Sequence, residues 1–188
     1  MRKRSSISLN KKTNNLHRFI AAASTCLERT TFDKLTVWQI VSEAGLSRQT
    51  FYRCCNNKFD LLNRYISELI ELSFNRAEKE GAMSRFPEYL VRQLEPEREL
   101  FAAAGISGEY ESPVSTTKRS LYNRFMKYVF ENGCRMDRYQ EDLLDVYCEA
   151  FVYILRRWCL HDIEGDSADI AARILDMMPV KIKKILLL

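Results

Sequence analysis

The chain has 188 residues, of which 46% are hydrophobic, so it can form one compact domain or two small ones with buried cores. Only six Gly and four Pro are present, which argues against a turn-rich β architecture. The sequence has no apolar run of about eighteen residues, and its basic N-terminal segment lacks the apolar stretch of a secretory signal. We therefore expect a cytoplasmic protein without membrane contact.

The net charge of +4 is unevenly distributed along the chain. Residues 1–60 hold eleven Lys and Arg against four Asp and Glu, whereas residues 61–188 hold eighteen against twenty-one. A basic front part on a mildly acidic body is typical of a DNA-binding head on a regulatory body. An ordinary solvated surface would give the same asymmetry, so charge alone does not decide the function.

The spacing of the six cysteines and two histidines matches no zinc site. We expect no bound metal and no cofactor. The sequence also lacks a glycine-rich phosphate loop and a plausible pair of nucleophile and base, so we do not expect an enzyme.

A first helix is predicted where apolar residues recur at helical spacing. These residues are Leu16, Phe19, Ile20, Ala23 and Leu27. The helix should end near Arg29. Phe32 and Leu35 follow in a short loop and are expected to pack into the same core.

A second helix should begin after Thr36, because Thr36 and Gln39 have the spacing of a capping box. Gly45 is expected to end it, since a left-handed position after a helix costs glycine least. Ser47 can cap a third helix. Two helices joined by a short turn with glycine are typical of a helix-turn-helix.

The third helix carries an unusual set of polar side chains. Phe51 is its obvious core residue, whereas Arg48, Gln49, Tyr52 and Arg53 project to other sides. Guanidinium and amide groups can hydrogen-bond base edges in the major groove. An accidental helical turn in a bundle is the alternative, but the cap, the glycine and the polar face together favour DNA binding.

Helical patterns continue to the end of the chain. A connecting helix is predicted over about 57–80, followed by helices over 86–94, 100–104, 115–129, 143–158 and 166–178, without a convincing strand. We predict an all-α protein of about nine helices. A three-helix helix-turn-helix domain spans 1–60, and a helical bundle for ligand binding and dimerisation spans 61–188.

The segment TFDKLTVWQIVSEAGLSRQTFYRCCNNKFDLL resembles the DNA-binding domain of the tetracycline-repressor (TetR) family. That family has a threonine-capped helix, an Ala-Gly turn, a Ser-x-x-Thr-Phe-Tyr recognition helix and a Lys-x-x-Leu-Leu continuation. The corresponding residues here are Thr36, Ala44, Gly45, Ser47, Thr50, Phe51, Tyr52, Lys58, Leu61 and Leu62. The later segment FVYILRRWCLHDIEGDSADIAARIL is similar to the last two helices of Firmicutes-type members.

The resemblance implies a set of DNA-binding residues. They are Thr36, Arg48, Gln49, Thr50, Tyr52, Arg53 and Lys58. Arg48 and Gln49 take base-reading positions, and Thr50 can meet a thymine methyl group or a phosphate. Tyr52 and Lys58 take phosphate-contact positions, as does Thr36 at its helix start.

The resemblance also implies a homodimer and a ligand pocket in the body. The candidate pocket residues are Phe101, Phe125, Tyr128, Tyr147 and Phe151. The candidate dimer residues on the last two helices are Leu144, Phe151, Leu155, Ile170, Ile174 and Met178. Each of these side chains could instead fill the core of one subunit.

Cys54 and Cys55 depart from the family pattern, which has an aromatic or histidine residue followed by phenylalanine. Adjacent side chains on a helix point about 100° apart, so these two thiols do not readily form a disulfide with each other. The smaller side chains could loosen the recognition helix and weaken operator binding.

The sequence therefore predicts a ligand-responsive transcriptional repressor that binds a palindromic operator in double-stranded DNA as a homodimer. We also expect an unidentified small-molecule effector to bind this repressor. The alternative is a TetR-like regulator that acts through a protein partner, with weak or no specific DNA binding. Loss of tight packing at Cys54 and Cys55 is the feature that keeps this alternative open.

Overall fold

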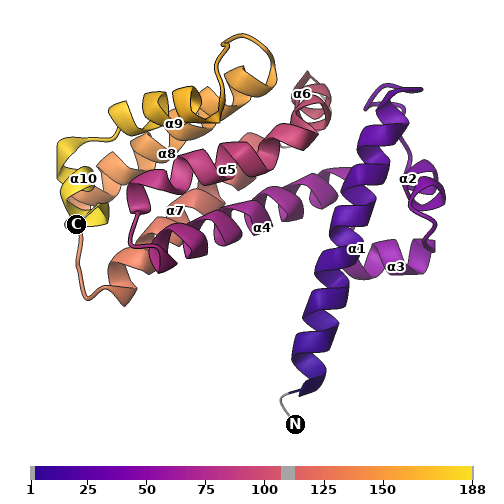
Figure 1. Cartoon of the computed structure of the whole chain (residues 1–188), viewed down its shortest axis with the longest axis horizontal. Helices are drawn as coiled ribbons and strands as arrows, with labels where there is room; N and C mark the ends of the chain where they lie inside the picture. The colour runs from indigo at the N-terminus through magenta and orange to yellow at the C-terminus, as the bar shows by residue number, and fades with distance from the viewer. Residues whose placement is uncertain (1–2, 107–112, 188) are drawn as a thin grey trace. The chain divides into compact units, whose positions relative to one another are not determined.

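The computed structural model describes residues 3–106 and 113–187, and all regular structure in these ranges is helical (Figure 1). The α-helices are α1 (Lys3–Leu27), α2 (Val37–Glu43), α3 (Arg48–Cys54), α4 (Lys58–Lys79), α5 (Phe86–Leu94), α6 (Arg98–Ile106), α7 (Pro113–Glu131), α8 (Arg138–Cys159), α9 (Ser167–Asp176) and α10 (Val180–Leu186). Two short 3-10 helices, η1 (Met83–Arg85) and η2 (Glu95–Glu97), flank α5. The predicted all-α class is confirmed.

Packing divides the described chain into two units. Unit 1 contains residues 3–65 and 97–106, and unit 2 contains residues 66–96 and 113–187. The division differs from the predicted bounds of 1–60 and 61–188 in two places. It falls inside α4, and α6 packs with unit 1 although it lies within the region 61–188.

Unit 1 is built around α1, which packs against α2, α3 and α6. Phe19 of α1 and Phe51 of α3 are both fully buried, and their rings meet edge to face with centroids 5.0 Å apart. On the α6 side, the Ser24 hydroxyl donates to the Glu97 carboxylate, and Tyr65 stacks on Phe101 at 6.3 Å. The helix-turn-helix segment is therefore anchored to a common apolar core.

The predicted helix starts of unit 1 are confirmed by their hydrogen bonds. The Thr36 hydroxyl accepts from the Gln39 N–H at 3.3 Å, and the Gln39 side chain accepts from the Thr36 N–H at 2.8 Å. Ser47 accepts from the Thr50 N–H at 3.1 Å. Asn57 accepts from the Asp60 N–H at 2.8 Å. Each cap satisfies a backbone donor that the helix itself leaves unpaired.

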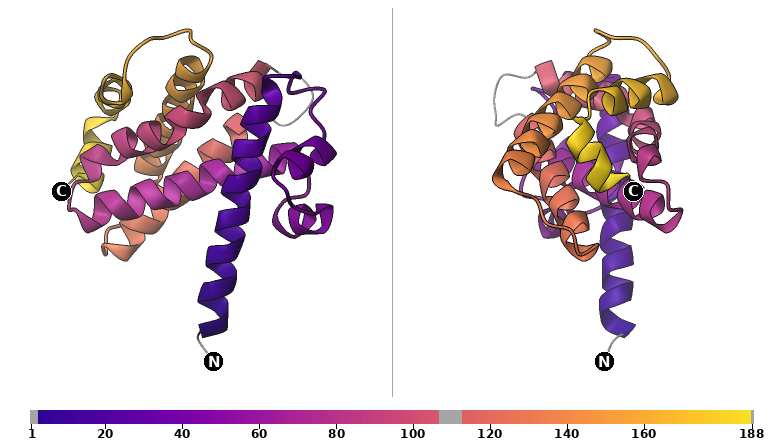
Figure 2. Two further views of the ribbon diagram at one scale, coloured as in Figure 1. Left: turned by 45° about the vertical axis from the view of Figure 1, so that its right-hand side comes forward. Right: turned by 90° about the vertical axis from the view of Figure 1, so that its left-hand side faces the viewer.

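Unit 2 is a bundle in which α5 packs along α9 and α7 packs along α8. The C-terminal helix α10 lies across one end of this bundle (Figure 2). It contacts α7 and α8 and buries Ile182 and Leu186. The helix α8 begins earlier than predicted, because Asp137 and Gln140 form a capping box before its apolar stretch.

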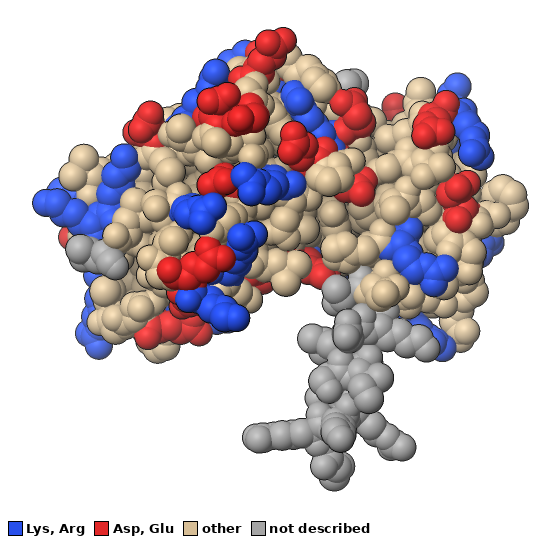
Figure 3. Space-filling model, in the orientation of Figure 1, with Lys and Arg blue, Asp and Glu red and all other residues tan. Residues whose placement is uncertain are grey.

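Arg124 is the most deeply buried charged side chain in the described part of unit 2, at 3% exposure. Its guanidinium lies 4.0 Å from the Phe74 ring centroid and donates to Asn75 at 3.0 Å and Glu78 at 3.2 Å. These contacts fasten α7 to α4. Elsewhere on unit 2, acidic and basic side chains are interspersed on the face shown in Figure 3, and many form ion pairs such as Arg92–Glu88.

Candidate nucleic-acid interface

The α2–α3 connection is a tight turn with glycine in the left-handed region. Gly45 has φ of 60°, its N–H donates to the Ser42 carbonyl, and the Leu46 N–H donates to the Val41 carbonyl. Arg18 of α1 donates to the Ala44 carbonyl at 2.7 Å. The turn satisfies the carbonyls at the end of α2 and holds α3 at a fixed orientation to it within unit 1.

The helix α3 has a buried side and an exposed side. Phe51 and Cys54 are buried at 0% and 5% exposure. The exposed side chains of the helix are Arg48, Gln49, Tyr52 and Arg53. At about 100° per residue these four positions share one face. Sequence reasoning placed the same residues at the surface, and the structure brings them together there.

Tyr52 is held in place while it remains 57% exposed. Its ring meets the buried Phe51 ring edge to face, with centroids 5.6 Å apart. Thr50 is half-buried, and its hydroxyl lies 2.9 Å from that of Ser47. Tyr52 thus presents a fixed phenol beside the two arginines.

Thr36 is exposed at the start of α2. Its hydroxyl accepts from the backbone in the capping box and also donates to the Gln39 side-chain oxygen at 2.9 Å. A contact of Thr36 with DNA would share this hydroxyl with the cap.

The Lys58 side chain is held by hydrogen bonds to the backbone of unit 1. Its ammonium donates to the carbonyls of Phe32 at 2.6 Å, Asp33 at 2.9 Å and Leu35 at 3.2 Å. It also lies 4.9 Å from the Phe32 ring centroid. An ammonium has three donors, so these carbonyls can take all of them. The structure gives Lys58 a role in holding the α1–α2 loop, which sequence reasoning missed.

Cys54 and Cys55 lie in the core of unit 1, at 5% and 1% exposure. Cys55 has extended backbone and its N–H donates to the Phe51 carbonyl at 2.8 Å, so it ends α3. The two thiols therefore act as small buried side chains and leave the outward face of α3 intact.

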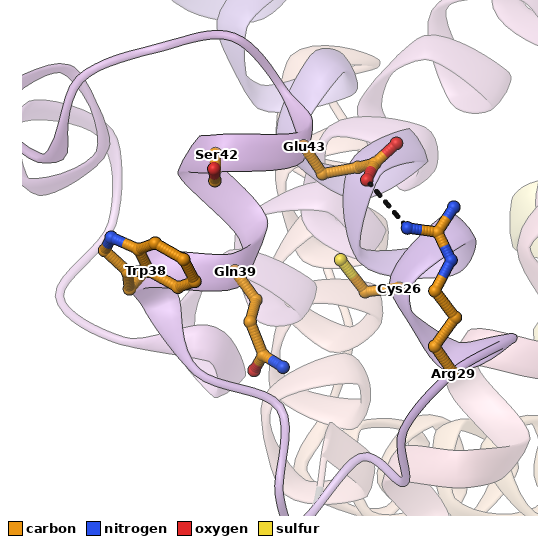
Figure 4. A pocket seen from close by; sticks show the side chains of 6 residues that line it. All are labelled: Cys26, Arg29, Trp38, Gln39, Ser42 and Glu43. Atoms are coloured by element: carbon orange, nitrogen blue, oxygen red, sulfur yellow. Dashed lines mark ion pairs between the residues drawn. The ribbon is translucent and has the colours of Figure 1, made fainter.

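A hollow of about 230 Å³ lies beside α2 (Figure 4). Its lining residues are Cys26, Arg29, Trp38, Gln39, Ser42 and Glu43. Arg29 and Glu43 form an exposed ion pair at 3.7 Å across it. Burial and the nearby Glu43 carboxylate raise the pKa of the Cys26 thiol, so this group is a poor nucleophile at neutral pH. Trp38, at the rim, is 58% exposed and was not singled out from the sequence.

The predicted pocket residues are distributed over the two units. Phe101 packs in unit 1 against Tyr65, whereas the other four lie in unit 2. Phe125, Tyr147 and Phe151 are buried in an aromatic cluster with Phe74 and Phe86, and Tyr128 packs on the rim against Phe74. These rings are packed edge to face or tilted against one another, as in a filled core.

Tyr147 stands out in this cluster because its hydroxyl is buried without a hydrogen-bond partner in the described residues. The side chain is 1% exposed, and burial raises its pKa well above the ordinary tyrosine value. A buried hydroxyl without a partner destabilises the fold by about 1–3 kcal/mol. It is thus an unsatisfied polar group within a mostly apolar cluster.

The predicted dimer residues complete the core of the subunit and do not lie at its surface. Leu144, Phe151, Leu155, Ile170, Ile174 and Met178 are all buried, at 5% exposure or less. The helix α8 instead has a second apolar face. It comprises Tyr139, Leu143, Val146, Ala150 and Tyr153, and we call it the α8 seam. Its spacing alternates between four and three residues, as in helices that pack against a second helical pair.

The part of the chain that the structure describes contains no cluster of three or more metal-binding side chains. Among the described helices, none is long and apolar enough to cross a membrane.

Comparison with known proteins finds solved structures with a similar fold but no similar sequence or family model. No protein-family model and no curated protein sequence matches the chain. Three solved structures share its fold. The first, described as the dihydroxyacetone kinase operon activator DhaS, has a TM-score of 0.66 and 14% identity and covers 91% of this chain and 97% of its own.

The second structure, described as the fatty acid degradation regulator FadR from Bacillus halodurans, has a TM-score of 0.56 and 15% identity and covers 87% of this chain and 93% of its own. The third, a TetR transcriptional regulator from Streptococcus agalactiae, has a TM-score of 0.52 and 16% identity and covers 93% of this chain and 98% of its own. All three are described as regulators or activators and none as an enzyme. Over about nine-tenths of its length, the chain shares the fold of these three proteins, one of which is described as a TetR transcriptional regulator.

Proposed function

We propose that this protein is a DNA-binding transcriptional regulator that reads its operator with α3. The exposed face of Arg48, Gln49, Tyr52 and Arg53 is the observation that carries the proposal. It lies on the second helix of a helix-turn-helix, in a fold shared with regulators. Such a helix fits the major groove and reads bases through its first turns.

Each side chain of this face has a distinct expected partner. The Arg48 guanidinium suits guanine O6 and N7, and the Gln49 amide suits adenine N6 and N7. Tyr52 and Arg53 can donate to phosphate oxygens and so position the helix. Thr50 and Thr36 would add short contacts beside them. Lys58 is left out of this set, because backbone carbonyls already engage its ammonium.

The α8 seam supports a homodimer. Val146, Tyr153 and Tyr139 are 65%, 55% and 57% exposed, although they lie on one apolar stripe of a long helix. A second copy related by a twofold axis would pair the same stripe with itself. Two copies would carry two α3 helices, which matches a palindromic operator.

A ligand that releases the operator would have to act through unit 2. A ligand could reach the Tyr147 hydroxyl, which lacks a partner among the described residues, only if rings of this packed cluster moved apart, and it would need an apolar body with a hydrogen-bond acceptor. Ligand binding would favour one of two conformations that differ in operator affinity. We expect this protein to repress transcription. Because DhaS is described as an activator, activation of transcription is the alternative outcome.

The proposal is tested by selecting duplexes from a random pool with the purified full chain and measuring binding across a salt series. The proposal requires an enriched palindromic site and a steep fall of affinity with salt, because phosphate contacts release counterions. The binding stoichiometry should be two chains per palindrome. Weak binding without any enriched sequence would instead favour a regulator that acts through a protein partner.

A further inference from the structure

Unit 1 exposes two large aromatic side chains among those that the structure describes. Tyr52 belongs to the α3 face, and Trp38 lies in the first turn of α2, at 58% exposure. The two helices of the helix-turn-helix therefore each present one aromatic ring to solvent. Trp has the largest apolar surface of any side chain and is common at the energetic centre of binding surfaces.

The fold of unit 1 does not account for the position of Trp38. The helix α2 buries Ile40 and Val41 on one side, and helical spacing places Trp38 and Ser42 on another. In Figure 4 the ring lies at the rim of the hollow farthest from the Arg29–Glu43 ion pair. The indole N–H has no hydrogen-bond partner within the described ranges.

We propose that Trp38 is a DNA-contacting residue, which extends the α3 face onto α2. This inference rests on the proposed function. The indole can pack on deoxyribose or on a thymine methyl group, and its N–H can donate to a phosphate oxygen. DNA is favoured over a protein partner because Trp38 shares its helix pair with Arg48 and Arg53, in the basic part of the chain.

A neutral aromatic contact differs from an arginine contact in its response to salt. Replacement of Arg53 should reduce the slope of log affinity against log salt by about one, because one fewer counterion is released. Replacement of Trp38 should lower affinity at every salt concentration and leave that slope unchanged. The salt series therefore distinguishes the loss of a neutral contact at Trp38 from the loss of a positively charged contact such as Arg53.

The intrinsic fluorescence of the full chain provides a direct test. The second tryptophan, Trp158, is 1% exposed in unit 2, so quenching by acrylamide reports mainly on Trp38. Binding of the selected duplex is followed separately by the anisotropy of a label on the DNA. At saturation, Trp38 should become protected from acrylamide. Trp38→Ala should weaken binding about 10- to 100-fold, and Trp38→Phe less than about tenfold.

The matched control is Phe130→Ala, which removes an aromatic side chain that is 82% exposed in unit 2 and should leave affinity unchanged. Circular dichroism shows whether each variant is folded. The inference is wrong if the duplex binds while acrylamide quenches Trp38 as strongly as before and Trp38→Ala binds like wild type. A protein would then be the expected partner of Trp38. If wild type binds no duplex specifically, both the proposed function and this inference fail.

Discussion

Lys58 makes hydrogen bonds within the fold that the sequence did not predict. The resemblance placed it among phosphate contacts, whereas its ammonium donates to three carbonyls of the α1–α2 loop. Backbone hydrogen bonds such as Leu35 N–H to the Thr31 carbonyl close turns in that loop, and the ammonium satisfies carbonyls in addition. The charge of Lys58 is thus engaged within the fold of unit 1, and our proposal assigns DNA contacts to the arginines of α3.

Lys58→Met should therefore reduce stability more than it reduces DNA recognition. Hydrogen bonds to a charged donor contribute about 1.5–3 kcal/mol, and their loss should lower the thermal midpoint by several degrees. The measurement is thermal unfolding together with DNA binding across a salt series. A salt slope that falls by about one with unchanged stability would show that Lys58 contacts phosphate after all.

Tyr147 gives the opposite case, a polar group that the described fold leaves unsatisfied. Tyr147→Phe keeps the ring and removes the hydroxyl, so it should stabilise the ligand-free protein by about 1 kcal/mol. Chemical denaturation measures the change. Tyr89→Phe is the matched control and should destabilise, because the Tyr89 hydroxyl donates to Glu80. Destabilisation by Tyr147→Phe would show that its hydroxyl has a partner.

At the level of elements, the joint between α4 and α5 is held by a small cluster of charges. The Tyr89 ring lies between Arg76 and Arg85, whose guanidinium carbons are 4.0 Å and 4.8 Å from its centroid. Glu80 at the end of α4 pairs with Arg76 at 2.9 Å and accepts from Tyr89. The hydrogen bond from Tyr89, followed by that from Arg76, lowers the pKa of the Glu80 carboxyl.

This lowered pKa predicts a pH dependence. The folded state favours the ionised carboxylate, so the stabilisation is complete above the ordinary carboxyl pKa of 4.5 and is lost as the pH falls through the lowered value. The thermal midpoints of wild type and Glu80→Gln should differ at pH 7 and converge as the pH falls below the lowered pKa of Glu80. Glu95→Gln, at an exposed carboxylate outside the cluster, should follow wild type throughout. A difference that persists at low pH would contradict this account.

Elements whose signals are local could be predicted from the sequence, and those that depend on tertiary packing could not. The caps at Thr36, Ser47 and Asn57 depend on residues within one turn, and each is present. The helix α8 has two apolar faces, and periodicity does not say which face turns inward. The residues predicted for the dimer lie on the faces that are buried in the core of unit 2. Likewise, the spacing of Phe101 does not show that α6 packs with unit 1.

At the level of the whole molecule, the α8 seam carries the proposal of a dimer. Val146→Glu places a charge in the middle of the seam and, in a twofold arrangement, opposite or near its own copy. Sedimentation should show a dimer for wild type. The dimer dissociation constant of the variant should be at least about tenfold higher, since burying an unpaired carboxylate is costly. Phe130→Glu, on an exposed aromatic outside the seam, should remain dimeric.

A wild-type chain that sediments as a monomer, or a Val146→Glu variant that dimerises as tightly as wild type, would rule out the α8 seam as the interface. Reduced operator binding by a folded monomeric variant would in turn link the dimer to DNA recognition, because one α3 helix alone reads only half of a palindrome.

The central claim, that the outward face of α3 reads bases, is tested most directly by the specificity of Arg48→Ala. Wild type and variant would be measured against the selected duplex and against every single-base change in one half-site. The variant should lose discrimination at one base pair, by about 1–3 kcal/mol, and keep it at the others. Uniformly weaker binding with an unchanged base preference would contradict base reading by Arg48 and reduce α3 to a contact with the DNA backbone.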